Sequence, residues 1–265
     1  MPDLDTAVTV DRDGAVASLT INRPRAHNAL NAAVLSELNS AIASLDSDRS
    51  VRAIVITGSG DRAFSAGADL DELAGLDAGA AQDVLAAGQQ VMYDIEHCHT
   101  PVIAAVNGLA LGGGFELVLS TTFPVLSTTA QLGLPESGLG LIPGYGGTQR
   151  LPRAIGSAAA AHVMLTGIRL EADRAYELGL TPVPPVEPDA LLTTTLELAA
   201  NIARRGPRAH AAILQALRAS APNRHDLALE TSLAAIATGS PEAAEGIVAF
   251  KERREPKFAT PGGDF

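Results

Sequence analysis

The feature that most constrains the fold is a pair of short apolar runs, 53–57 and 101–106, each followed closely by glycine. Strands without polar alternation are buried on both faces, as in parallel sheets covered by helices. A helical pattern occupies 77–95 between the two runs, and a short helix is expected at 113–120, directly after a glycine run. This alternation of strand, loop and helix predicts an α/β fold with parallel strands.

The N-terminal part adds a hairpin and a helix to this pattern. Residues 7–21 predict two strands around Asp13-Gly14, a dipeptide suited to a tight turn. Residues 28–45 follow a helical period, with apolar residues on one stripe. Both elements precede the first buried strand.

The C-terminal part is expected to be helical. From about residue 157 the strand pattern fades, and a proline-rich stretch at 181–188 separates the two regimes. Helices are expected at 188–205, 208–220, 225–238 and 241–253. We therefore predict an α/β core over 1–186 and a helical region over 187–265, which packs on the core or on a neighbouring subunit.

The charge and the cysteine content argue against several classes of function. A formal net charge of -11 disfavours a nucleic-acid or anionic-membrane surface, because both partners are polyanions. The single cysteine, Cys98, rules out an intramolecular disulfide and fits a reducing, cytoplasmic compartment. We expect no secretory signal in residues 1–12, and the apolar runs are too short to span a bilayer. An anionic ligand would need a local cluster of cations or backbone N–H groups.

Three glycine-containing segments carry the candidate chemistry. Taken alone, 64–70 is an ordinary loop after a strand. In 107–117, three consecutive glycines expose backbone N–H groups at a helix start, which suits a developing negative charge. Glu116 follows there and by itself would only complement the helix dipole. The segment 131–151 is dense in glycine and proline yet apolar, which predicts a pocket floor holding Glu136 ready for proton transfer.

Together with N-R-P-R-A-H-N-A-L at 22–30 and the closing segment 250–258, these segments resemble the crotonase (enoyl-CoA hydratase/isomerase) superfamily. The hallmarks A-G-A-D, G-G-G-x-E, P-E and I-P-G-x-G-G-T-Q-R-L occur in the family's order. The resemblance implies a ββα superhelical core followed by a C-terminal helical oligomerisation region. It also implies a homotrimer or a dimer of trimers.

The resemblance assigns roles to four residues. The backbone N–H groups of Ala68 and Gly113 would form an oxyanion hole, which the thioester enolate intermediate requires. Glu116 would activate a water, and Glu136 would protonate C2 of the enoyl group. Neighbouring carboxyls split their pKa values, which lets one act as acid and the other as base. The implied activity is enoyl-CoA hydratase: reversible syn addition of water to a trans-2-enoyl-CoA, with no metal and no cofactor beyond the CoA of the substrate.

The resemblance also implies contacts to the CoA thioester. The implied residues are Arg25, Ser65, Ala66, Asp69, Leu70, Gly112, Leu134, Pro135 and Gly144. Arg25 and either Lys251 or Lys257 stand where related proteins place cations for the phosphates. A solvated surface cation is the simpler interpretation of the two lysines.

Two other functions stay open at this point. An enoyl-CoA isomerase would move a double bond with one dominant carboxylate, and a non-catalytic relative would bind RNA or protein. RNA binding needs a basic helix, whereas 28–45 has Glu37 and neither Arg nor Lys. The run Glu96-His-Cys-His99 invites a zinc hypothesis, but adjacent side chains diverge and the sequence has no second ligand cluster. Leu134 and Pro124 depart from the common hydratase pattern, and Pro124 is expected to disturb strand pairing.

Overall fold

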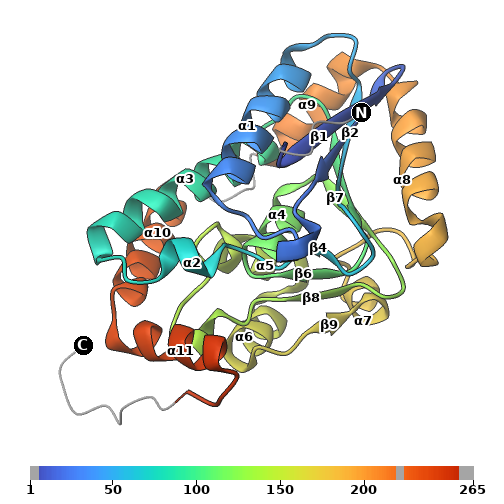
Figure 1. Ribbon diagram of the computed structural model, residues 1–265. Coiled ribbons are helices and arrows are strands. Elements are labelled where there is room, and N and C mark those ends of the chain that lie inside the picture. Colours follow the sequence, from blue (N-terminus) through green and yellow to red (C-terminus); the bar gives the residue numbers. More distant parts are fainter. Residues whose placement is uncertain (1–5, 219–223, 257–265) are drawn as a thin grey trace.

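The computed structural model describes residues 6–218 and 224–256, which form two β-sheets surrounded by helices (Figure 1). The five-stranded sheet has the order β1-β2-β3-β5-β7, and the four-stranded sheet has the order β4-β6-β8-β9. The strands are β1 (Val8–Asp13), β2 (Val16–Ile21), β3 (Ala53–Gly58), β4 (Ala63–Ser65), β5 (Val102–Val106), β6 (Leu109–Leu111), β7 (Phe123–Leu126), β8 (Gln131–Gly133) and β9 (Leu170–Glu171). The helices are η1 (Pro24–Ala26), α1 (Ala32–Ser47), α2 (Leu70–Leu73), α3 (Ala78–Glu96), α4 (Gly113–Ser120), η2 (Glu136–Leu139), α5 (Gly147–Ile155), α6 (Ser157–Thr166), α7 (Ala172–Glu177), α8 (Pro188–Ala203), α9 (Pro207–Arg218), α10 (Arg224–Thr238) and α11 (Pro241–Glu252).

From β3 to β8, consecutive strands alternate between the two sheets. β3, β5 and β7 pair in parallel in the first sheet, while the strands that follow them, β4, β6 and β8, pair in parallel in the second. Helices α3, α4 and α5 come after these pairs of strands. The prediction of an α/β fold with a ββα superhelical core is therefore confirmed.

The N-terminal hairpin forms as predicted, but the first long helix begins later than its periodicity suggested. β1 and β2 pair antiparallel around Gly14, whose φ is 57°. α1 starts at Ala32, because the Asn31 side chain accepts a hydrogen bond from the Val34 N–H (3.0 Å) and caps the helix. Asn28 is not helical: its φ is 57°, and its buried amide donates to the Ala63 carbonyl (2.7 Å). Asn28 thereby ties the 22–30 loop to β4.

Pro124 does not disturb strand pairing, so that expectation is wrong. Pro124 lies inside β7 opposite Ala104 of β5. β7 is the last strand of the five-stranded sheet. A proline has no N–H to donate, and an edge strand tolerates this because only one side of it is paired.

Helices cover both faces of the five-stranded sheet. One face joins α1 and α3 in the larger apolar core, which includes Leu19, Leu38 and Ile54. The other face packs against α8, where Leu191 and Ala199 meet a second cluster of strand residues. The burial of these alternate strand faces explains why the runs at 53–57 and 101–106 lack polar residues.

The helical region from α8 onward folds back on the core (Figure 1). The side-chain amide of Gln89 in α3 donates to the Leu227 carbonyl of α10 (2.9 Å). α11 packs on η2 so closely that a Cβ on Gly246 would overlap the backbone of Leu139. The two helices α10 and α11 therefore lie against the segments that carry the candidate site.

Candidate active site

The glycine run places the start of α4 against β4 and β8. Gly112 has a φ of 49° and donates its N–H to the Gly133 carbonyl (2.9 Å). A Cβ on Gly114 would overlap the Ser65 carbonyl, so only glycine permits this approach. The helix that begins at Gly113 therefore has its positive end next to the 65–68 turn.

The two backbone groups proposed as an oxyanion hole lie side by side. Gly67 takes a φ of 102°, and its N–H donates to the Ser65 hydroxyl (3.2 Å), which fixes the turn. A Cβ on Gly113 would lie 3.2 Å from the Ala68 nitrogen, and a Cβ on Gly67 would lie 3.3 Å from the Gly113 nitrogen. Both Ala68 and Gly113 line one pocket. The sequence prediction that these two positions meet agrees with the geometry.

Glu116 is buried on the first turn of α4, with 2% of its surface exposed. Its Oε1 accepts hydrogen bonds from the N–H groups of Tyr145 and Gly147, both at 2.8 Å. Gly147 is the first residue of α5, so the carboxylate also meets the positive end of that helix. Two backbone donors on one oxygen stabilise an ionised carboxylate.

Glu136 is the first residue of η2 and lies half-buried beside the glycine run. A Cβ on Gly112 would lie 3.1 Å from Glu136 Oε1, so a larger residue at 112 would crowd this carboxyl. Glu116 and Glu136 line the same pocket of about 250 Å³. Two carboxyl groups and two backbone donors thus converge on one cavity with mainly apolar walls.

Nine of the residues predicted for the site line this pocket. They are Ala66, Ala68, Leu70, Gly112, Gly113, Glu116, Pro135, Glu136 and Gly144. They come from the 64–70, 107–117 and 131–151 segments, which the superhelix brings together at the ends of β4, β6 and β8.

Four predicted CoA-contact residues lie outside the pocket. The Ser65 hydroxyl is fully buried and serves the turn, and the Asp69 carboxylate accepts from Arg23 (3.1 Å) while capping α2. Leu134 is fully buried beneath the loop at Gly147. Exposed Arg25 lines a separate hollow. Any contact from Ser65 or Asp69 to a ligand would therefore use the backbone.

Of the two lysines considered for the CoA phosphates, Lys251 is already ion-paired on the surface. The Lys251 ammonium pairs with the Asp71 carboxylate (2.6 Å), linking α11 to α2. This hydrogen bond lowers the pKa of Asp71. Lys257 lies outside the described residues.

Tyr145 is a pocket residue that the sequence reasoning did not assign. Its ring lies between two glycines: a Cβ on Gly88 of α3 would overlap it, and a Cβ on Gly113 would lie 2.9 Å from its Cδ2 and Cε2. Burial, with the nearby charges of Glu116 and Glu72, raises the pKa of the Tyr145 phenol. A glycine in the middle of a helix is unfavourable, and Gly88 was the one signal that a bulky group packs there.

Other pocket residues, some within the singled-out segments and some far from them in the sequence, were also missed. They are Leu73, Leu85, Leu111, Leu139, Leu141, Ile142, Arg169, Thr238 and Phe250. No periodicity or motif links positions such as Arg169, Thr238 and Phe250 to the glycine run. Thr238 and Phe250 reach the pocket only because the helical region folds back on the core, and Arg169 reaches it from the loop before β9.

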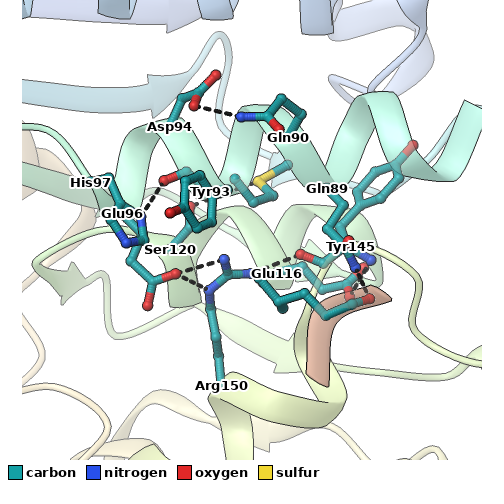
Figure 2. A network of polar contacts seen from close by, with 12 residues as sticks. Gln89, Gln90, Tyr93, Asp94, Glu96, His97, Glu116, Ser120, Tyr145 and Arg150 are labelled. Atoms are coloured by element: carbon teal, nitrogen blue, oxygen red, sulfur yellow. Dashed lines mark hydrogen bonds and ion pairs between the residues drawn. The ribbon is translucent and has the colours of Figure 1, made fainter. Parts of the chain in front are cut away.

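Arg150 and Glu96 lie behind the loop that contacts Glu116 (Figure 2). Arg150 donates from Nε (3.0 Å) and Nη2 (2.7 Å) to Glu96 Oε2. Its Nη1 donates to the Tyr145 carbonyl (2.8 Å). Arg150 is 4% exposed, so its charge is almost wholly removed from water.

His97, Cys98 and His99 each contact a different group: the Tyr93 carbonyl, the Asp94 carbonyl and the Asp46 carboxylate. Within 6–218 and 224–256, no three His, Cys, Asp or Glu side chains group as metal ligands. Cys98 is buried, and this burial together with the charge of Asp46 raises its pKa to about 12. In the same described ranges, no helix is both long and apolar enough to cross a bilayer.

Comparison with known proteins points to one family. The family model described as "Enoyl-CoA hydratase/isomerase" matches residues 11–261. A crotonyl-CoA hydratase of Syntrophomonas wolfei is 39% identical over 255 residues, covering 95% of this chain and 97% of that protein. A short-chain-enoyl-CoA hydratase of Clostridium acetobutylicum is 37% identical and covers 94% and 95%. A solved carnitinyl-CoA hydratase from Mycobacterium avium superposes with a TM-score of 0.85 at 32% identity, covering 96% and 98%.

Proposed function

This chain belongs to the enoyl-CoA hydratase/isomerase family, and we propose that it catalyses the reversible syn addition of water to a trans-2-enoyl-CoA, giving a 3-hydroxyacyl-CoA. The observation that carries the proposal is the convergence of Glu116, Glu136 and the two N–H groups of Ala68 and Gly113 on one pocket. An enzyme that hydrates an enoyl thioester needs an acid, a base and a site for the enolate oxygen. This pocket offers candidates for all three.

The chemistry follows from where these groups lie. The thioester oxygen accepts hydrogen bonds from Ala68 and Gly113, which stabilise the enolate as charge moves onto it. Ionised Glu116 takes a proton from water while the water oxygen bonds to C3, and the π electrons move toward the thioester oxygen. Protonated Glu136 then gives its proton to C2, and the thioester carbonyl forms again. The backbone donors on Glu116 Oε1 support its role as the base.

The CoA portion needs cations, because the chain as a whole is acidic. We propose that Ala66 and Leu70 meet the pantetheine through the backbone and that Arg25 serves the phosphates. Arg25, His27 and Arg62 line one hollow, and Ala66 donates its N–H to the His27 carbonyl (2.9 Å). The hollow is thus joined to the catalytic turn by a direct hydrogen bond.

The acyl group is proposed to be short. The pocket of about 250 Å³ lies below the ~300–1,000 Å³ common for small-molecule sites. The Tyr145 ring cannot move away, because Gly88 and Gly113 hold it on both sides. The names of the crotonyl-CoA and short-chain-enoyl-CoA hydratase relatives agree with this preference.

We further propose a trimer or a dimer of trimers that uses the helical region at its subunit contacts. Large apolar side chains are exposed along this region; they are Leu192, Ile213, Leu217, Leu233, Ile236, Val248 and Phe250. Exposed apolar surface of this kind is typical of subunit interfaces. Light scattering coupled to size-exclusion chromatography would test the assembly, and a monomer would contradict it.

The reaction is tested by adding the protein to crotonyl-CoA and following the loss of the conjugated enoyl absorbance. Hydration produces 3-hydroxybutyryl-CoA and removes the absorbance. A parallel assay with 3-butenoyl-CoA reports isomerisation, because the absorbance then rises. Hydration of crotonyl-CoA supports the proposal, whereas isomerisation without hydration would replace it with the isomerase.

A further inference from the structure

We infer that Arg150, held by Glu96, is a positioning residue for the Glu116 carboxylate, acting through the backbone of Tyr145. The inference rests on the proposed function, because it assumes that Glu116 is the base. Arg150 does not line the pocket. Its influence on the reaction is therefore transmitted through the loop that separates it from Glu116.

The Arg150 guanidinium is fixed by three hydrogen bonds, two to Glu96 and one to Tyr145. Nε and Nη2 donate to Glu96 Oε2 at 3.0 and 2.7 Å, and Nη1 donates to the Tyr145 carbonyl at 2.8 Å. The guanidinium is planar and rigid, so fixing two of its nitrogens on Glu96 also fixes the third. The Arg150 side chain is 3% exposed and that of Glu96 is 19% exposed, so water does not replace these contacts easily.

Both backbone groups of Tyr145 are hydrogen-bonded, the carbonyl to Arg150 and the N–H to Glu116. Its carbonyl accepts from Arg150, and its N–H donates to Glu116 Oε1 at 2.8 Å. The Gly147 N–H donates to the same oxygen at 2.8 Å. Gly146, between them, has a φ of 110°, and a Cβ there would overlap the guanidinium. The 145–147 loop therefore lies between the Arg150 guanidinium and the Glu116 carboxylate and contacts both (Figure 2).

This arrangement has two consequences for the reaction. First, the two N–H groups remain aimed at Glu116 Oε1, which keeps the carboxylate oriented. Second, loosening the loop removes part of this orientation, so the carboxylate meets the reacting water less often in the productive geometry and kcat falls. Substrate affinity should change little, since Arg150 does not reach the pocket.

The test uses Arg150→Lys and Glu96→Gln in the full-length protein. Lysine keeps the charge but places all its donors on one nitrogen, which cannot reproduce the planar fork, and glutamine keeps an acceptor but removes the charge. The matched control is Arg174→Lys, because Arg174 pairs with Glu177 (2.8 Å) on the surface with 59% and 61% of the two side chains exposed. Two readouts are taken: kcat and KM for crotonyl-CoA hydration, and hydrogen–deuterium exchange of the peptide covering 144–147.

We expect kcat of both variants to fall by about tenfold or more while KM stays within about threefold. Exchange of the 144–147 peptide should accelerate by about tenfold. The Arg174→Lys control should match the wild type in all of these. If Arg150→Lys does not fold, Glu96→Gln carries the test.

The inference is overturned if folded variants keep the wild-type kcat and differ only in melting temperature, because the ion pair would then serve stability alone. Unchanged exchange of the 144–147 peptide would also overturn it. If the wild type hydrates no enoyl-CoA, the proposed function fails by itself. The exchange measurement still decides in that case whether Arg150 holds the loop.

Discussion

Substituting Gly113 by alanine tests the oxyanion hole directly. The added Cβ would lie 3.2 Å from the Ala68 nitrogen and 2.9 Å from two carbons of the Tyr145 ring. The ring cannot retreat, because Gly88 lies against its other side. The methyl group must therefore push the two N–H donors apart or tilt the start of α4.

The size of the effect follows from the loss of one donor. Removing a hydrogen-bond donor from an oxyanion hole costs about 2.7–4 kcal/mol of transition-state stabilisation, or about 10²–10³ in kcat. In Gly113→Ala the N–H group is displaced and not deleted, so we expect a fall near the lower end, about 10²-fold. KM should change much less, since the charge on the oxygen develops only in the transition state.

The assay is the initial rate of crotonyl-CoA hydration over a range of substrate concentrations, with thermal unfolding measured in parallel. Gly79→Ala is the matched control: its Cβ would make only an ordinary contact of 3.4 Å with the Asp77 side chain. The control should keep the wild-type kcat. A Gly113→Ala variant that is folded and within about threefold of the wild-type kcat would refute the assignment of Gly113.

Three further predictions concern specificity, pH and metals. Tyr145→Ala should raise the ratio of kcat/KM for trans-2-octenoyl-CoA to that for crotonyl-CoA by about tenfold, as expected for a pocket that accepts a few more methylenes. Tyr145→Phe should leave this ratio unchanged. Equal ratios in the wild type and both variants would contradict the role of the ring. Because burial raises the pKa of Cys98 from 9.0 to about 12, the folded chain holds that proton more tightly than the unfolded chain. The resulting stabilisation is complete below pH 9 and is lost as the pH rises toward 12. Between pH 8.5 and 10 the unfolding free energy, measured in urea, should therefore fall by about 1 kcal/mol more for the wild type than for Cys98→Ala. An equal fall of the unfolding free energy in both proteins would contradict this. Hydration should survive dialysis against EDTA, and a loss that Zn²⁺ or Mg²⁺ restores would show that the reaction needs a metal.

Elements with a local signal could be predicted from the sequence. The helix at 113–120 has the expected bounds, since a glycine run marks its start and a polar pair, Thr121 and Thr122, follows it. The start of α1 was misplaced because periodicity continues through Asn28, whereas the capping by Asn31 decides where the helix begins. The position of Pro124 at a sheet edge depends on the strand order, which no local pattern records.

The candidate site was predictable where the backbone contributes and less so where side chains do. Motifs locate the turn at Ala68 and the helix at Gly113, because glycine and small residues report backbone geometry directly. They do not report that the Ser65 and Leu134 side chains point into the core. Tyr145 was missed for the same reason: its position depends on Gly88, which is distant in the sequence.

Glu116 and Glu136 are proposed to act as base and acid on one substrate in one pocket. The most direct test measures crotonyl-CoA hydration by Glu116→Gln and Glu136→Gln, each with its affinity for butyryl-CoA measured by calorimetry. General acid or base catalysis contributes about 10²–10⁴, so we expect each kcat to fall by that factor while butyryl-CoA binding stays within about threefold. A folded variant of either kind that hydrates crotonyl-CoA at close to the wild-type rate would contradict the claim.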